Sequence, residues 1–325
     1  MSILVAGTTG AVAHHLIESL PRELGPLIAA GLEPPPTHQA RRDVHYVRTD
    51  LRDPEEAQRL MEYHQPTQVY HLAAQMSVRA GENEPEESLL GNVSIARNVL
   101  EACRRHCPGA RILLQSSSEV YGRGPSGRGA EVPRTESDPL SPLSTTGASL
   151  ACAEILAGQY ALGHGLRILV TRPFNVVGPG LSQRLLAGEI AWQLARIRLD
   201  KGEPIVYAGD LEVKRDYLDV RDLARAYLLL MEKGEVGQTY NICTGKAVSA
   251  RQVAELLLQF HGGNVELRFD PRRERTTEIP IMVGSPEKLT SATGWLPAIS
   301  LRESLRDLWN DMLQRHALER KGTIC

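Results

Sequence analysis

The first residues of the chain set the strongest constraint on its fold. The run ILVAG (residues 3–7) is apolar and ends in glycine, and apolar residues then recur at helical spacing through Leu20. The segment GTTGAVA places Gly7, Thr9 and Gly10 where the strand turns into the helix. Backbone amides and the helix N-terminus at such a turn can accept a pyrophosphate. The chain therefore begins, we expect, with a strand, a tight phosphate-binding turn and a helix.

The rest of the chain divides into two parts of different character. Further apolar runs follow at PLIAAGLE, which we expect to end at Glu33, and at VHYVRTDL, QVYHLAAQ, RILLQSSS and RILVTRPFNVVG, with helix-like segments between them. This alternation predicts an α/β fold with a doubly wound parallel sheet over residues 1–175. Residues 176–325 mix helices, isolated strands and Pro/Arg-rich loops. They predict a smaller α/β lobe on the carboxyl edge of the sheet, with some segments crossing between the lobes.

Charge and cysteine content exclude several classes of function. With 37 basic and 39 acidic side chains, the net charge is −2, so no long-range field attracts nucleic acid or an anionic membrane. The five cysteines are scattered, which suits reduced thiols in the cytoplasm, and no cluster indicates a metal site. The N-terminal apolar run lacks a basic flank, so it predicts a strand rather than a signal peptide. No apolar stretch is long enough to cross a bilayer.

Two acidic residues follow the second and third predicted strands. Glu33 comes 23 residues after Gly10, near the offset of about 20 at which a carboxylate meets the adenosine ribose. Such a carboxylate repels a 2′-phosphate and favours NAD over NADP, although a solvated loop acid before PPP is nearly as good an interpretation. Asp50 is either a neighbour of the adenine or, as we favour, the cap of the next helix. The third glycine of the usual phosphate turn is replaced by Ala13.

Several motifs together point to a known family. The segments GTTGAVA, YHLAAQMSV, SSSEVYG, GASLACAE and RPFNVVGPG resemble the extended short-chain dehydrogenase/reductase family, specifically its nucleotide-sugar epimerase/dehydratase branch. The later segments GDLEVKRDYLDVRDLARAY, YNICTGKAVS and TTEIPIMVGSPEKLTSATGWLP are similar to GDP-mannose 4,6-dehydratases and GDP-4-keto-6-deoxy-mannose reductases. The resemblance runs from Ile3 to about Leu313. It implies a Rossmann lobe that binds NAD or NADP and a second lobe that binds a nucleotide sugar, with a GDP-sugar favoured.

The resemblance also implies which residues meet each ligand. On the cofactor side these are Gly7, Gly10, Glu33, Ala73, Ala74 and Gln75, with Asn92 as a structural residue. On the sugar-nucleotide side they are Asn175 and, for the diphosphate, Arg215 and Arg275, with Arg273 as the alternative to Arg275. A guanidinium suits a diphosphate because it stays ionised and meets two oxygens at once. For Arg215 the alternative is a surface ion pair with Asp216. Glu189 departs from the pattern, since a dehydratase would place a basic phosphate contact near it.

The catalytic pair of the family is absent. The resemblance places Thr146 at the position of a tyrosine that takes the hydroxyl proton at the sugar C4. It places Leu150 at the position of a lysine that binds the nicotinamide ribose and lowers the pKa of that tyrosine. A threonine hydroxyl can orient a sugar hydroxyl but is too poor an acid to replace a phenol, whose pKa is about 10. The resemblance keeps Ser117, which contacts the C4 oxygen, and Glu119, which removes the C5 proton. Alternatively, the hydroxyls of SSS only cap the turn after the strand.

Three hypotheses follow for function. The first is an active nucleotide-sugar enzyme in which Ser117 and Glu119 transfer protons and Thr146 only positions the sugar. The second is a noncatalytic relative that binds NAD or a sugar nucleotide. The third is that the cofactor site is lost as well, which the retained Gly7, Gly10, HLAAQ strand and candidate phosphate arginines disfavour. By analogy with the family we expect a homodimer or homotetramer. It would form through the helices NVSIARNVLEACRR and TGASLACAEILAGQYALGHG, using a face made of Ala148, Ala151, Cys152 and Ile155.

Overall fold

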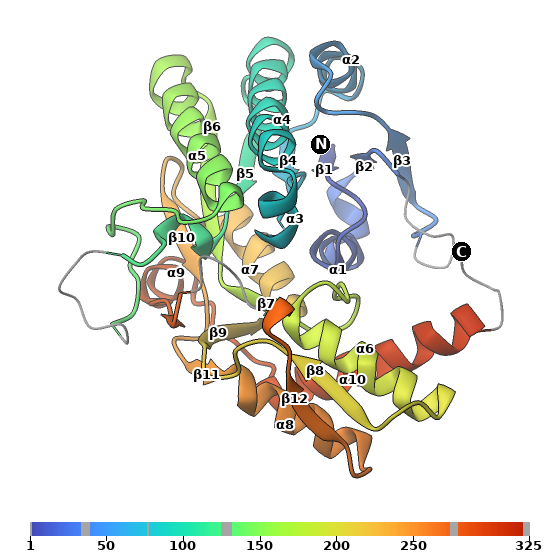
Figure 1. Cartoon of the computed structure of the whole chain (residues 1–325). Helices are drawn as coiled ribbons and strands as arrows, with labels where there is room; N and C mark the ends of the chain where they lie inside the picture. Colours follow the sequence, from blue (N-terminus) through green and yellow to red (C-terminus); the bar gives the residue numbers. More distant parts are fainter. Residues whose placement is uncertain (1, 34–39, 77, 125–131, 274–278, 321–325) are drawn as a thin grey trace.

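The computed structural model describes residues 2–33, 40–76, 78–124, 132–273 and 279–320. Its centre is a seven-stranded parallel sheet in the order β10-β6-β5-β4-β1-β2-β3 (Figure 1). The strands are β1 (Ile3–Ala6), β2 (Leu27–Gly31), β3 (Val44–Arg48), β4 (Gln68–His71), β5 (Arg111–Gln115), β6 (Arg167–Pro173) and β10 (Thr239–Ile242). The strand order reverses between β1 and β4, and ligands of open α/β sheets bind beside the carboxyl ends of the strands at such a switch point. The predicted doubly wound Rossmann-type α/β fold is confirmed.

Helices cover both faces of this sheet (Figure 1). One face buries an apolar cluster under three helices, and these are α2 (Pro54–His64), α4 (Pro85–His106) and α5 (Thr145–His164). The opposite face is covered by α1 (Ala11–Ser19), α7 (Val220–Lys233) and α9 (Glu287–Thr293). A short helix, α3 (Val78–Asn83), precedes α4, and single turns of 3-10 helix are η1 (Arg22–Leu24), η3 (Ser118–Tyr121) and η4 (Pro271–Arg273).

A second lobe is built around β9 (Lys214–Asp219). This strand pairs in parallel with β7 (Asn175–Val177) and β13 (Ile281–Met282) and antiparallel with β11 (Ala247–Ser249). A separate parallel pair joins β8 (Ile205–Ala208) and β12 (Glu266–Phe269). The lobe has its own apolar core, to which α6 (Leu186–Asp200), α8 (Ala250–His261) and α10 (Leu301–Arg320) contribute.

Segments of the second half return to the large sheet. Strand β10 pairs with β6 at the sheet edge, and α7 packs against α1 and β5. The division at residue 175 therefore stays a prediction about the two lobes, with α7 and β10 lying on the large sheet. One predicted boundary is wrong: β2 ends at Gly31, so Glu33 lies two residues beyond the strand.

Two residue-level predictions are corrected here. The cap of α2 is Asp53, whose carboxylate accepts from the backbone amides of Glu55 (2.8 Å) and Glu56 (3.3 Å), so the cap predicted for Asp50 is wrong. Asp50 instead forms an ion pair with Arg52 at 2.8 Å. On α5, Ala151 is buried within the chain, so it is not available to the dimer face predicted for it.

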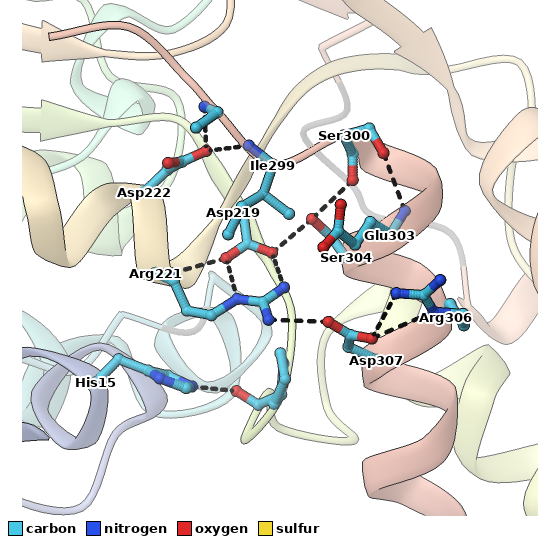
Figure 2. Close-up of polar contacts among 12 residues, drawn as sticks. His15, Asp219, Arg221, Asp222, Ile299, Ser300, Glu303, Ser304, Arg306 and Asp307 are labelled. Atoms are coloured by element: carbon cyan, nitrogen blue, oxygen red, sulfur yellow. Dashed lines mark hydrogen bonds and ion pairs between the residues drawn. The ribbon is translucent and has the colours of Figure 1, made fainter.

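A polar network ties the N-terminus of α7 to α10 (Figure 2). The buried carboxylate of Asp219 caps α7, accepts two hydrogen bonds from the Arg221 guanidinium (2.9 and 2.8 Å) and accepts one from Ser304 Oγ (2.6 Å). Arg221 also donates to Asp307 on α10 at 2.8 Å. These bonds hold the second lobe against the large sheet, so they fix the relative position of the two sides of the candidate site.

Candidate functional site

The phosphate turn is defined by backbone geometry. Gly7 has a φ of +100°, and a β-carbon there would come within 2.8 Å of the Ala73 amide nitrogen, so only glycine fits without strain. Its own amide donates to the Ala30 carbonyl at 2.7 Å. Gly10 is the N-cap of α1 and has open space around it, and both Thr9 and Gly10 are exposed. The turn thus presents an open helix N-terminus at the carboxyl end of β1.

Thr8 is a residue of this turn that the sequence analysis missed. Its hydroxyl donates to the Glu33 carbonyl at 2.8 Å and lies where a β-carbon on Gly31 would come within 2.6 Å. The bond fixes the backbone of the segment after β2 while the Glu33 side chain stays exposed. A threonine between two glycines of a phosphate turn is the signal that could have found it. Asp50 lies half-buried beyond β3, where its hydrogen bonds with Arg52 lower the pKa of the carboxyl group.

The segment after β4 is held by α4 and α5. Ala73 and Ala74 are half-buried and Gln75 is exposed. Asn92 on α4 accepts from the Gln75 amide at 2.7 Å, donates to the Gln75 carbonyl at 3.1 Å and donates to Ser149 Oγ on α5 at 2.8 Å. The structural role predicted for Asn92 is confirmed.

The segment after β5 carries Ser117 and Glu119, the two polar residues predicted to meet the sugar. Ser117 is the N-cap of η3, and its Oγ accepts from the Glu119 amide at 3.3 Å. The side chains of Ser117 and Glu119 are both half-buried. Because Ser117 Oγ accepts in this bond, its own proton remains available to another acceptor. The capping alternative for SSS is therefore compatible with a ligand contact by the same hydroxyl.

The first turns of α5 present no ionisable group. Thr146 has 0% of its surface exposed, and its hydroxyl lies beside α3, where a β-carbon on Gly81 would come within 2.5 Å. Leu150 is 2% exposed and belongs to an apolar cluster with Val120 and Phe174. Both positions that the sequence analysis predicted for the catalytic pair are thus packed inside the protein.

The cap of α5 and its contacts with the sheet are nevertheless well formed. Ser144 caps the helix by accepting from the Gly147 amide at 3.0 Å. Further along the helix, buried Glu154 forms a bidentate pair with Arg172 of β6, with bonds of 3.0 and 2.6 Å. Arg172 also donates to the Tyr121 hydroxyl at 2.8 Å, and burial raises the pKa of Tyr121 to about 12. Charge and hydrogen bonding therefore fix α5 on the sheet independently of Thr146 and Leu150.

The predicted sugar-nucleotide residues lie on adjacent strands of the second lobe. Asn175 of β7 pairs with Tyr217 of β9, two residues from Arg215. Arg215 is 8% exposed and donates to the Lys214 carbonyl at 2.9 Å. The alternative of a surface ion pair with Asp216 is wrong, because both side chains are buried. The Asp216 carboxylate accepts from Thr244 and Gly245 at the ends of the lobe's loops, and burial raises its pKa.

The remaining basic candidates have a different outcome. Arg275 lies outside the described residues. Arg273, its alternative, forms ion pairs with Glu189 of α6 and with Asp270, the latter at 3.3 Å. Glu189, which departs from the predicted pattern, thus pairs with an arginine. The carboxylates of Glu189 and Asp270 together oppose the charge of Arg273.

The residues predicted for the two ends of a nicotinamide dinucleotide differ in how well they suit it. The open turn at Gly7 and Gly10 and the fixed segment at Glu33 suit a pyrophosphate and an adenosine ribose. At the predicted nicotinamide end, Leu150 has no charge or hydrogen-bonding group for a ribose, and Thr146 is buried. Within the described ranges, no group of three or more His, Cys, Asp or Glu could hold a metal ion, and no helix is long and apolar enough to cross a membrane.

Comparison with known proteins places the chain in a family. Residues 3–243 match the NAD dependent epimerase/dehydratase family. The chain is 34% identical over 250 residues to a GDP-6-deoxy-D-mannose reductase of Pseudomonas aeruginosa, a match covering 77% of this chain and 81% of that protein. The structure of RMD from the same organism, complexed with NADPH, is 31% identical with a TM-score of 0.82, over 97% of this chain and 99% of that one.

A further solved structure contains a nucleotide sugar. A UDP-glucose 4-epimerase of Thermotoga maritima with UDP-glucose is 27% identical with a TM-score of 0.86, over 98% of this chain and 100% of that one. The matched region includes the phosphate turn, the segment after β5 and α5. The chain belongs to the NAD dependent epimerase/dehydratase family.

Proposed function

We propose that this protein binds a nucleotide sugar beside a dinucleotide site and transfers a proton on a sugar that already carries a carbonyl at C4. The observation that carries this proposal is the contrast along one edge of the sheet. Ser117 and Glu119 are half-exposed beyond β5, whereas Thr146 and Leu150 are buried without an ionisable group. A base for proton transfer is present and a base for starting hydride transfer is not.

The proposed chemistry uses only groups of this chain. A carbonyl at C4 acidifies the hydrogen on C5, so a carboxylate can remove it without a phenolate. Glu119 would take the C5 proton, and the Ser117 hydroxyl would donate to the C4 oxygen as negative charge develops there. Return of the proton to C5 completes a cycle in which no electron pair leaves the sugar.

The sugar nucleotide would be held by the second lobe. Asn175 and Arg215 would meet the sugar nucleotide and its diphosphate, and a guanidinium stays ionised while it binds phosphate oxygens. The similarity of the later motifs to GDP-mannose dehydratases and the GDP-sugar relative favour a GDP-sugar. The position of Arg275 in the RRER segment keeps it a candidate for the same diphosphate.

Isotope exchange tests this proposal directly. The purified chain would be incubated in D₂O with 4-keto-6-deoxy sugars carried on GDP, dTDP, UDP and CDP, and mass spectra would follow deuterium uptake at carbon. We expect uptake of one deuterium from one donor, and loss of that uptake in Glu119→Gln. No uptake above a protein-free blank, or equal uptake in Glu119→Gln, would overturn the proposal. Hexose donors without a carbonyl serve as the control, since water loss from them would need the missing base.

A second candidate is a binding protein without turnover. The complete burial of Thr146 and the packing of Leu150 favour it, because both remove chemistry and leave the fold unchanged. It predicts thermal stabilisation by a sugar nucleotide, about 2.7 kcal/mol at 100 times Kd, with no exchange or product. Failure of every sugar nucleotide to stabilise the chain would contradict it.

We also propose a homodimer through the outer faces of α4 and α5. Exposed apolar residues lie on these helices, including Ile155 at 66% and Leu162 at 93% exposure. The free thiol of Cys152 lies on the same face of α5. Sedimentation of the wild type should give a dimer or larger, and Ile155→Glu combined with Leu162→Glu should give a monomer. A wild-type monomer at working concentration would contradict the proposal.

A further inference from the structure

We infer that the dinucleotide site of this chain forms favourable contacts only with the adenosine diphosphate half of its ligand. ADP-ribose should therefore bind as tightly as NAD. This inference rests on the proposed dinucleotide binding and specifies its ligand class. The ligand would be an adenosine diphosphate ester whose second half contributes little to affinity.

The adenosine end of the site keeps its contacts because they come from backbone. Gly7 retains the φ of +100° that the turn requires, and Gly10 leaves the first amides of α1 uncovered. Thr8 ties the turn to the Glu33 carbonyl at 2.8 Å, which sets the spacing between the pyrophosphate and ribose positions. These groups belong to the turn before α1 and to the segment after β2, and they do not involve α5.

The nicotinamide end has lost its contacts because they came from side chains. Leu150 packs in a cluster with Tyr121, Phe174 and Met282, and Met76 from the segment after β4 packs against the same cluster. The surroundings of Leu150 are therefore apolar. A ribose placed there would exchange hydrogen bonds with water for contact with methyl groups, which opposes binding.

Thr146 does not compensate for this loss. Its hydroxyl faces α3, where Gly81 leaves just enough room for it, and none of its surface is exposed. A ligand could reach the hydroxyl only after α3 moved. With Thr146 and Leu150 on α5, the site lacks contacts to the nicotinamide riboside, and the rest of the site stays in place.

The wild-type chain alone decides the question. Isothermal titration would compare ADP-ribose, NAD⁺, NADH and NADPH on the full chain, and we expect ADP-ribose and NAD⁺ to agree within about threefold, under 1 kcal/mol. Bound NADH should also keep the nicotinamide fluorescence of free NADH, because its ring stays in water. NAD⁺ binding at least about tenfold tighter than ADP-ribose would overturn the inference and leave the proposed dinucleotide binding standing. Binding of none of these ligands would overturn both.

A pair of matched variants locates the effect at one residue. Leu150→Lys should strengthen NAD⁺ binding relative to ADP-ribose by about tenfold, as expected for one regained charge-assisted hydrogen bond. Leu150→Met keeps the size and the apolar character and should leave the ratio unchanged. Circular dichroism checks that each variant folds. If folded Leu150→Lys kept the wild-type ratio, Leu150 would not be the residue that loosens the site.

Discussion

The turn before α1 and the first turns of α5 lie along the same edge of the large sheet and differ in how their function is encoded. At α1 the essential groups are backbone amides and the positive φ of Gly7. At α5 the two positions predicted for the catalytic pair are side-chain positions, and they hold Thr146 and Leu150. The comparison teaches that side chains on a helix can change while other contacts hold the helix in place, whereas a site made of backbone groups depends on the fold itself.

We expect the largest effect from breaking the buried ion pair that holds α5 on the sheet. Arg172→Ala leaves the buried Glu154 carboxylate without its partner, and breaking a buried pair in this way costs about 3–5 kcal/mol of unfolding free energy. Urea denaturation followed by circular dichroism measures the loss. Arg268→Ala is the matched control, because its pair with Glu266 is exposed and should cost under about 1 kcal/mol. Equal losses in the two variants would show that the buried pair does not fix α5.

A pH titration tests the strand between the two regions. His71 is the last residue of β4 and is buried. Neither ring nitrogen has a hydrogen-bond partner in another described residue. Burial lowers the pKa of His71 to about 4. The unfolded chain binds the proton near pH 6.5, so stability should fall as the pH drops from about 6.5 to 4, by up to about 3 kcal/mol. His71→Leu should remove this part of the pH dependence of urea midpoints. A variant with the wild-type slope would contradict the assignment.

A single methyl group tests the phosphate turn. Gly7→Ala must hold a φ of +100° and bring a carbon within 2.8 Å of the Ala73 nitrogen, which should cost about 1–3 kcal/mol. We also expect ADP-ribose affinity to fall at least about tenfold. Gly109→Ala, with no atom near its β-carbon position, is the control for calorimetry and thermal unfolding. Unchanged ADP-ribose affinity in Gly7→Ala would show that the ligand does not bind at this turn.

The smallest expected effect concerns the cap of α5. Ser144→Ala removes the acceptor of the Gly147 amide and should lower stability by about 1 kcal/mol. ADP-ribose affinity should not change, because the adenosine end depends on α1. Ser249→Ala, which removes the capping box of α8, gives the same loss in the other lobe as a reference. A drop in ADP-ribose affinity with Ser144→Ala would show that the turn before α1 and the first turns of α5 are coupled.

The sequence predicts the large sheet well and the polar pairings poorly. Apolar runs ending in glycine or polar residues mark the strands, because a parallel sheet buried on both faces needs nearly continuous apolar segments. The pairs Glu154–Arg172 and Glu189–Arg273 join residues from different elements, so no local pattern reveals them. Asp50 and Asp53 both precede α2, and only Pro54 at the first helical position marks Asp53 as the cap.

The position of β10 has a consequence for synthesis of the chain. Strand β6 pairs with β10 through Val170–Pro173, and β10 comes from the second half of the sequence. Until Thr239–Ile242 leaves the ribosome, β6 presents unpaired amides and carbonyls at an open sheet edge. The first half cannot complete its sheet on its own, so a fragment ending at residue 175 should aggregate when it is expressed alone.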